Sequence, residues 1–260
     1  MRIDYGKQNI FDSDIYFTAN SLKKNFLTQG NNVLLFEKKI KTFLNVNHAI
    51  VCNSGTSAIH LALLSIDVKK NDVIIMPAIN FIAAYNMSLL LGAKIYLVDV
   101  NHTTGQMCPD EVEVVIRKYK LKKIKAIITM YLGGAAENVI NFYKLKKKYK
   151  CYLIEDSCHA FGSSYFYKNK LLKVGSCNHS DISTFSFHPL KTITTGEGGA
   201  VTTNNKNIYL KLLLLRSHSL FKTKKKHYWS YTSKGIGYNY RLSDINCALG
   251  ISQLKSINKI

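Results

Sequence analysis

Apolar runs of four or five residues alternate with helix-like segments from residue 49 to about residue 217. Short apolar runs bounded by turn residues predict buried strands, and a regular alternation of strand and helix predicts a mainly parallel sheet flanked by helices. The fold class is therefore α/β. The predicted strands are Ala49–Cys52, Asp72–Met76, Lys94–Val98, Ala126–Met130, Tyr152–Glu155, Ser183–Phe187 and Gly199–Thr203. The predicted helices are Thr56–Ser65, Asn80–Leu91, Asp110–Tyr119 and Val139–Lys148.

Three parts are expected along the chain. Residues 1–45 hold a helix-like stretch and the Gln29-Gly30 turn, and they are interpreted as an N-terminal arm. Residues 46–220 form the large α/β domain. Residues 221–260 hold a loop and a helix that starts at Ser243. That helix keeps its apolar spacing to the end of the chain, so we expect a small C-terminal domain to be missing.

The composition is that of a globular protein. A chain of 260 residues with 47% hydrophobic residues can bury a full core. We find no apolar run suited to a membrane span and no signal peptide, so a cytoplasmic location is expected. The six cysteines show no CxxC pair and no zinc-like spacing, which favours reduced thiols and no metal. Cys158 beside His159 is a poor thiol nucleophile, because neighbouring strand residues point to opposite faces.

The formal net charge of +20 gathers in runs such as Lys144–Lys150 and Lys222–Lys226. The first run shares a helical pattern with Leu145 and Tyr149, which favours a solvated helix face. A small anionic partner is the second interpretation. Nucleic acid is the least favoured, because no helix-turn-helix or zinc pattern accompanies the charge.

Lys191 stands between a strand-like run and the glycine turn Gly196-Glu-Gly-Gly199. A lysine among apolar and small residues either extends its amine to solvent or serves in Schiff-base chemistry. The remaining motifs favour the second role, because they supply the other parts of a pyridoxal phosphate (PLP) site.

Three of these motifs each follow a predicted strand. Ser54-Gly-Thr-Ser-Ala58 opens a helix, so it is either an anion cradle or a plain helix cap. Asp156 is either a helix cap or a carboxylate that keeps a pyridine nitrogen protonated. His159 is either a packing residue or a neighbour of the cofactor ring, and Phe81 either packs in the core or covers one face of the ring.

With these residues in place, the chain resembles the DegT/DnrJ/EryC1/StrS family of PLP-dependent sugar aminotransferases nearly from end to end. The resemblance is carried by Tyr5-Gly-Lys-Gln8, Asn25-Phe-Leu-Thr-Gln-Gly30, Asp156-Ser-Cys-His-Ala160, Phe187–Gly199 and Asn239-Tyr-Arg-Leu-Ser-Asp244. It implies the PLP-dependent transferase fold type I, like that of aspartate aminotransferase. Within the family the motifs most resemble PseC-type enzymes, which use glutamate to aminate the C4 keto group of a UDP-linked 4-keto-6-deoxy-N-acetylhexosamine on the way to pseudaminic acid.

The resemblance also implies roles for individual residues. Lys191 would bind PLP covalently and then shuttle a proton, and Asp156 would pair with the pyridine nitrogen. His159 and Phe81 would flank the ring. The phosphate would be held by Gly55, Thr56, Ser57 and Ser186, together with Asn239 from the second subunit of a homodimer. The sugar-nucleotide side would be lined by Tyr5, Asn25, Phe26, Leu27 and Thr28.

Two departures from the family leave alternatives open. Members of the family continue for roughly a hundred more residues into a closing domain, so an inactive or PLP-binding remnant is one alternative. Ser219 stands where the family usually has glycine, and we expect strain in that turn. A PLP-dependent sugar dehydratase is a further alternative, but such relatives have histidine at the Schiff-base position and this chain has Lys191.

Overall fold

The computed structural model describes residues 6–222, 227 and 230–260. Seven strands form one central sheet in the order β1-β9-β8-β5-β4-β2-β3. Strand β9 runs antiparallel to β1 and β8, and the other neighbouring pairs are parallel, so the predicted mainly parallel α/β sheet is confirmed. The strands are β1 (His48–Cys52), β2 (Val73–Pro77), β3 (Lys94–Val98), β4 (Ala126–Met130), β5 (Tyr152–Asp156), β8 (Ile182–Ser186) and β9 (Gly199–Thr203).

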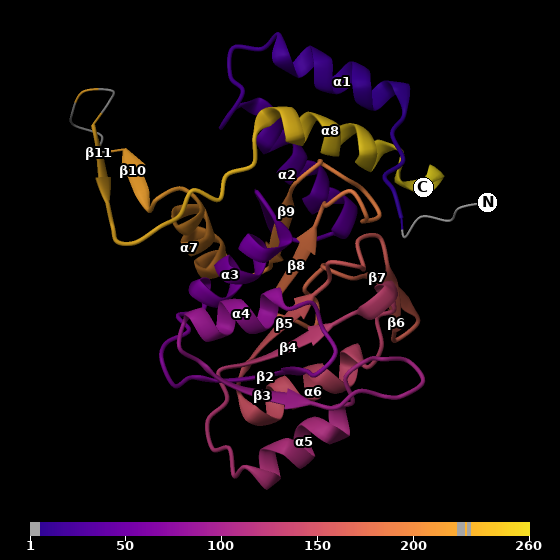
Figure 1. Ribbon diagram of the computed structural model, residues 1–260, viewed down its shortest axis with the longest axis vertical. Coiled ribbons are helices and arrows are strands. Elements are labelled where there is room, and N and C mark those ends of the chain that lie inside the picture. Colours follow the sequence, from indigo (N-terminus) through magenta and orange to yellow (C-terminus); the bar gives the residue numbers. More distant parts are fainter. Residues whose placement is uncertain (1–5, 223–226, 228–229) are drawn as a thin grey trace.

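Helices cover both faces of this sheet (Figure 1). One face packs against α3 (Gly55–Ser65), α4 (Ala83–Leu90) and α7 (Lys206–Arg216). On the other face, α2 (Asn31–Leu44) and α8 (Asp244–Lys255) cover the end of the sheet near β1 and β9. Helices α5 (Pro109–Lys118) and α6 (Val139–Tyr149) cover the end near β2 and β4. Helix α1 (Asp12–Leu22) lies outside α8.

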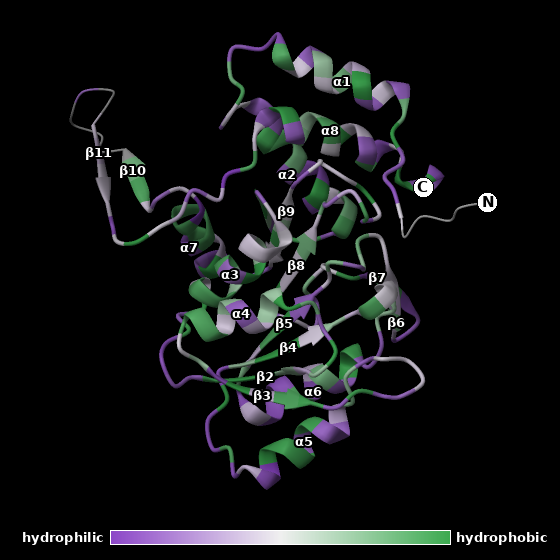
Figure 2. Ribbon diagram, in the orientation of Figure 1, coloured by the Kyte–Doolittle hydropathy of each residue, from purple (hydrophilic) through white to green (hydrophobic). Residues whose placement is uncertain are grey.

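Local sequence signals account for where several helices begin. The side chains of Ser54, Asn205 and Ser243 each accept a hydrogen bond from a backbone N–H of the first turn of α3, α7 and α8. Helix α5 starts with Pro109, has acidic residues in its first turn and basic ones in its last, and so complements the helix dipole. Hydrophilic and hydrophobic residues alternate along the ribbon of α5 in Figure 2.

The N-terminal segment is fastened to the core. Phe36 and Ile40 of α2 are fully buried in the cluster that also holds Ile251 of α8. The Asp244 carboxylate accepts hydrogen bonds from the backbone N–H of Gly30 at 2.7 Å and of Asn32 at 2.8 Å, which ties the start of α2 to the start of α8. The division of the chain near residues 45 and 220 stays a prediction.

Several elements differ from the sequence-based expectation. Helix α8 ends at Lys255 and a separate 3₁₀ turn covers Ile257–Lys259, so continuous helix to the last residues is wrong. Helix α7 and two hairpins were not predicted. The hairpin strands are β6 (Ser164–Tyr167), β7 (Lys170–Lys173), β10 (Leu220–Lys222) and β11 (Tyr231–Ser233).

The Lys144–Lys150 run lies on α6 as a solvated face, as predicted. Leu145 is buried while Lys144 and Lys147 are exposed. Lys148 pairs with Glu113 at 2.6 Å. Most of the Lys222–Lys226 run lies outside the described residues. Among the helices of the described part, none has the length and apolarity needed to cross a lipid bilayer.

The turn after α7 requires the strained backbone that was expected at Ser219. His218 and Ser219 both have positive φ, of 58° and 54°. This left-handed conformation is unfavourable for residues other than glycine. The Ser219 hydroxyl donates a 2.9 Å hydrogen bond to the Ile236 carbonyl, which helps to hold the turn against the segment that follows.

Candidate active site

The candidate site lies at one edge of the sheet, where β1, β5 and β8 end. The three strands run in the same direction, because β9 is antiparallel to both β1 and β8. Their carboxyl ends therefore bring together Ser54–Ser57, Asp156–His159 and Ser186–Lys191. Strand β9 begins at the same edge with Gly199, where a Cβ atom would lie 2.3 Å from the Ser54 carbonyl oxygen. Only glycine lets these backbones approach so closely.

The N-terminus of α3 forms the proposed anion end of the site. Ser54 is the helix cap, and its Oγ accepts the Ser57 N–H at 3.1 Å. The Ser57 side chain is 4% exposed, and its hydroxyl bonds back to Ser54. Gly55 and Thr56 are half-buried at the start of the helix, where backbone N–H groups and the helix dipole favour an anion. The cap interpretation of Ser54 is confirmed, and the anion role stays a prediction.

Ser186 closes one side of this cradle. A Cβ atom at Gly55 would lie 2.8 Å from Ser186 Cβ and 3.2 Å from Cys158 Sγ. Glycine at position 55 thus allows β8, the β5 terminus and α3 to meet around one small space. The sequence alone places Ser186 at a strand end but does not show this contact.

We expect Gly55→Ala to destabilise the protein by about 1–3 kcal/mol, because the added methyl group overpacks this junction. The measurement is the free energy of unfolding by denaturant titration. In a chain that also carries Ser186→Gly, the Ser186 Cβ atom at 2.8 Å is absent. Gly55→Ala should then lower the free energy of unfolding by less. An equal cost in both backgrounds would contradict the packing at this junction.

Asp156 ends β5 and is 2% exposed. Burial raises the pKa of its carboxyl group, and hydrogen bonds from Cys158 and the nearby charges of His159 and Lys191 act in the opposite direction. The Cys158 backbone N–H lies 3.2 Å from Asp156 Oδ1. A buried carboxylate with so few donors is suited to a ligand that brings a positively charged N–H group.

Lys191 lies in the loop that follows β8 and is half-buried. Its backbone N–H donates to the His188 carbonyl at 2.9 Å. Further along the loop, the Thr194 N–H donates to Gln253 Oε1 of α8 at 3.2 Å. Because β8 is the parallel neighbour of β5, the loop that carries Lys191 leaves the sheet at the same edge at which Asp156 ends β5. The charge of Lys191 is among the influences that lower the pKa of Asp156. A lysine and a buried aspartate thus lie at the same edge of the sheet, beside the start of α3.

His159 stands three residues after Asp156 and is half-buried. Its Nδ1 accepts a long hydrogen bond from the Gly133 N–H at 3.4 Å, which leaves Nε2 to carry the ring proton. Burial, and then the charge of Lys191, lower the pKa of His159, so the ring is held neutral.

Other predicted site residues lie apart from this cluster. Phe81 is 62% exposed ahead of α4, and Asn239 is exposed on a separate segment. The Asn25–Thr28 segment is also exposed, and it is tied to the start of α8 by the hydrogen bond from the Asp244 N–H to the Leu27 carbonyl at 2.9 Å. Tyr5 lies outside the described residues. The roles of these residues stay predictions.

Sequence reasoning missed two contributors. Cys158 packs its thiol against Gly55 and donates its backbone N–H to Asp156 Oδ1, and the Gly133 N–H donates to the His159 ring. The sequence held a weak signal for the first, because Cys158 lies two residues after a strand-end aspartate. Gly133 gave no signal, since it lies 26 residues before His159.

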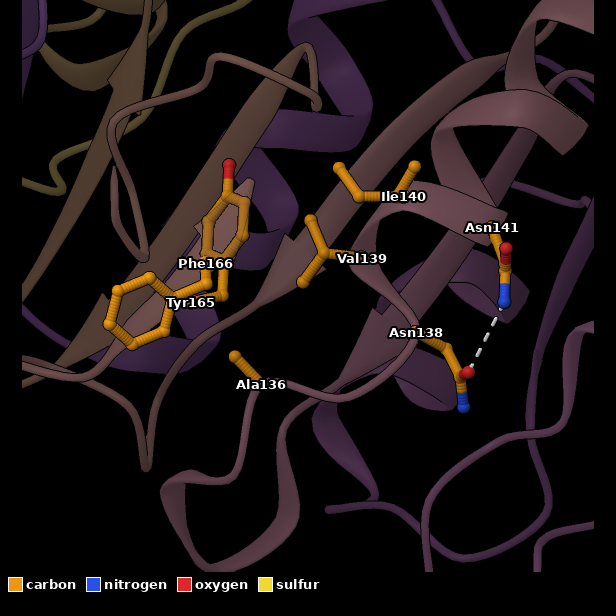
Figure 3. A pocket seen from close by; sticks show the side chains of 7 residues that line it. All are labelled: Ala136, Asn138, Val139, Ile140, Asn141, Tyr165 and Phe166. Carbon is orange, nitrogen blue, oxygen red and sulfur yellow. Dashed lines mark hydrogen bonds between the residues drawn. The ribbon is translucent and has the colours of Figure 1, made fainter. Parts of the chain in front are cut away.

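A separate hollow of about 290 Å³ lies between the start of α6 and β6 (Figure 3). The Asn138 and Asn141 amides bond to each other on one side, and the Phe166 ring stands on the other. Its lining shares no residue with the cluster around Lys191. The lining residues are Ala136, Asn138, Val139, Ile140, Asn141, Tyr165 and Phe166.

The chain is similar in sequence and in fold to known proteins. UDP-4-amino-4,6-dideoxy-N-acetyl-beta-L-altrosamine transaminase of Campylobacter jejuni is 43% identical over 256 residues, which is 98% of this chain and 65% of that relative. GDP-perosamine synthase of Escherichia coli O157:H7 is 38% identical over 228 residues, covering 88% of this chain and 58% of the relative. The solved structure of Helicobacter pylori PseC, an aminotransferase of pseudaminic acid biosynthesis, superposes with a TM-score of 0.88 at 35% identity, covering 100% of this chain and 67% of that one.

The chain thus spans between 58% and 67% of the length of these three proteins. Its fold is the one shared by solved aminotransferases, as the expected fold type I requires. The family model of the DegT/DnrJ/EryC1/StrS aminotransferases matches residues 11–260. The chain therefore belongs to the DegT/DnrJ/EryC1/StrS aminotransferase family.

Proposed function

We propose that this protein is a PLP-dependent aminotransferase that transfers the amino group of L-glutamate to the C4 keto group of a UDP-linked 4-keto-6-deoxy-N-acetylhexosamine. The observation that carries the proposal is that the loop with Lys191, buried Asp156 and the N-terminus of α3 lie together at one edge of the sheet. The names of the relatives support the sugar: three of them, at 43%, 40% and 39% identity, are altrosamine transaminases.

The residues present fit PLP at both of its charged ends. Backbone N–H groups of Gly55 and Thr56, with the Ser186 hydroxyl beside them, suit the phosphate. At the other end, buried Asp156 suits a protonated pyridine nitrogen. Ser57 supports the cradle through its capping hydrogen bonds, and its own contact with phosphate remains part of the proposal.

Bound PLP supplies an electron sink for the substrate carbon that loses its proton. Lys191 would hold the cofactor covalently, and its amine would serve as the base that removes and returns the proton at that carbon. Asp156 would keep the pyridine nitrogen protonated. Neutral His159 would lie beside the ring, and we assign Phe81 to the ring's other side.

The proposal includes a second copy of the chain. Asn239 and the Asn25–Thr28 segment are exposed, and large apolar side chains such as Phe26, at 67%, and Phe81, at 62%, are exposed with them. In a homodimer these residues would be covered: Asn239 would reach the partner's phosphate cradle, while Tyr5 and Asn25–Thr28 would line the sugar-nucleotide side. The basic surface suits the substrate's diphosphate.

The reaction is placed in the cytoplasm as part of this proposal. The six cysteines, which all lie within the described residues, are free thiols, and free thiols are typical of a reducing compartment. The proposal needs neither nucleic acid nor a membrane as partner.

The direct test is incubation of the chain with PLP, glutamate and the UDP-keto sugar, with mass spectrometry of the sugar product. Amination at C4 supports the proposal. Elimination of water in place of amination would show the dehydratase alternative, and a chain that binds PLP without forming either product would be the binding-only alternative.

Mixing two defective variants tests whether the sites are shared. Alone, the Lys191→Ala chain is expected to fix no label, and the Asn239→Ala chain is expected to fix little label at limiting PLP. After subunit exchange, roughly a quarter of the wild-type sites should return, because about half the dimers are mixed and each mixed dimer has one intact site. The measurement is borohydride-fixed label per chain. If mixing restores nothing, Asn239 does not act across the dimer.

A further inference from the structure

A buried histidine of α3 holds the segment that carries Asn239. His60 is 1% exposed, and its Nδ1 lies 2.9 Å from the Tyr240 hydroxyl. The Tyr238 and Tyr240 rings are stacked, with centroids 4.9 Å apart and planes inclined by 14°. The His60 ring meets Tyr238 edge-on at 4.9 Å. The side chains of Tyr238 and Tyr240 thus both contact the imidazole of His60, which lies in the middle of α3.

Backbone hydrogen bonds fix the same segment from its other side. The Tyr238 N–H donates to the Leu215 carbonyl at 2.7 Å, and the Tyr240 N–H donates to the Arg216 carbonyl at 3.1 Å. The Tyr240 carbonyl accepts the Asn53 N–H at 3.0 Å. Asn53 immediately precedes the helix cap Ser54. The segment is therefore held by backbone hydrogen bonds to the end of α7 and to Asn53, which precedes α3 in the same chain.

The pleat of this segment determines where Asn239 points. Successive side chains of an extended chain point to opposite sides, so inward-facing Tyr238 and Tyr240 send Asn239 outward. Both tyrosines are half-buried, whereas Asn239 is exposed and its backbone pairs with Ser217. The direction of the Asn239 side chain therefore depends on how Tyr238 and Tyr240 pack against His60.

The chemistry of His60 is unusual for a core residue. Its Nε2 is buried and has no hydrogen-bond partner among the described residues. An apolar side chain would fill the same space without an unpaired polar atom. Burial lowers the pKa of His60, so the ring is neutral and can bond to one hydroxyl group. What the imidazole supplies, and a leucine does not, is the directional bond to Tyr240.

We propose that the His60–Tyr240 hydrogen bond is a positioning device that sets Asn239 for the phosphate cradle of a second copy of this chain. The inference rests on the proposed function, since it takes PLP phosphate as the ligand and the homodimer as the working form. In this proposal, His60 and Tyr240 have no contact with the cofactor or the substrate. They act through Asn239, and they do so in the partner's site.

The test is PLP affinity in Tyr240→Phe, which keeps the ring stack and removes the hydroxyl. We expect the dissociation constant for PLP to rise about fivefold, the size of one ordinary hydrogen bond. The matched control is Tyr209→Phe on α7, whose ring stacks on His48 at 4.4 Å, away from the segment. Its PLP affinity should equal that of wild type. A light-scattering mass under the same conditions shows whether the dimer persists.

Two further measurements separate positioning from general stability. In an Asn239→Ala background, Tyr240→Phe should cause no further loss of affinity, because the residue through which it acts is gone. In mixed dimers of Tyr240→Phe with Lys191→Ala, the one site that retains Lys191 receives Asn239 from a chain with intact Tyr240. That site should bind PLP with wild-type affinity.

The outcomes are distinct. An additive loss in the Asn239→Ala background, a mixed dimer that remains weak, or a Tyr240→Phe chain that has lost the dimer would each overturn the inference. So would wild-type affinity in the Tyr240→Phe homodimer. If the wild-type chain fixes no PLP on Lys191, the proposed function itself fails, and that result is read before any variant is compared.

Discussion

Lys191→Ala is expected to abolish the borohydride-fixed pyridoxyl group and to lower transamination by about 10⁴-fold, the upper end for loss of a positioned acid–base group. The physical reason is that one amine both holds the cofactor and moves the substrate proton. The measurements are label mapping by peptide mass and single-turnover amination. Because Lys191 is half-buried in a loop fixed by Thr194 and Gln253, the fold should persist without its side chain.

The matched control for this variant is Lys144→Ala, which removes an exposed lysine from α6. It should keep the label, the activity and the unfolding midpoint of wild type. Retention of a fixed adduct in Lys191→Ala would refute the assignment of this lysine, provided that circular dichroism shows both variants to be folded.

Asp156→Asn is expected to lower the amination rate by about 10²-fold, which corresponds to roughly 3 kcal/mol for breaking a buried charge pair. A neutral amide cannot hold the pyridine nitrogen protonated, so the electron sink weakens while the shape of the site is kept. The measurement is the single-turnover rate at saturating PLP, which separates the chemical step from cofactor affinity.

Glu155→Gln is the matched control on the same strand. Glu155 is 3% exposed, and it accepts a hydrogen bond from the Tyr131 hydroxyl at 2.9 Å. Successive residues of β5 point to opposite faces, so Glu155 faces away from Asp156. Burial raises its pKa, so an amide is a close replacement. Equal rates in Asp156→Asn and wild type, or an equal loss in Glu155→Gln, would contradict the role given to Asp156.

Strand positions were largely predictable because buried parallel strands are short apolar runs bounded by turns. Lys94–Val98, Ala126–Met130 and Gly199–Thr203 were predicted to the residue. The antiparallel direction of β9 was not predictable in this way. Strand direction depends on how the Phe187–Gly199 loop turns back, and apolar periodicity carries no such information.

Local features of the sequence explain why α7 and the β6–β7 hairpin were not predicted. Helix α7 contains four consecutive leucines, Leu212–Leu215, and an unbroken apolar run hides the helical period. The β6–β7 hairpin turns through Lys168 and Asn169, which have φ of 46° and 61°. This turn lacks the glycine that marks tight hairpins in a sequence, so no turn was predicted there.

The candidate site was predictable in part for a simple reason. Residues that follow parallel strands meet at one edge, so Ser54–Ser57, Asp156 and Lys191 could be grouped from the sequence. Contacts between segments that are distant in the sequence could not be predicted in this way. Tyr240 lies 180 residues from His60 in the chain, and Gly55 meets Ser186 only because β1 and β8 flank β9.

The central claim is that this chain forms a PLP site around Lys191. The measurement that tests it most directly is incubation of the wild-type chain with PLP, reduction with borohydride and mapping of the pyridoxyl label by peptide mass. We predict one dominant label, on the peptide that contains Lys191. A folded chain that carries no label, or carries it on surface lysines such as those of α6, would contradict the claim.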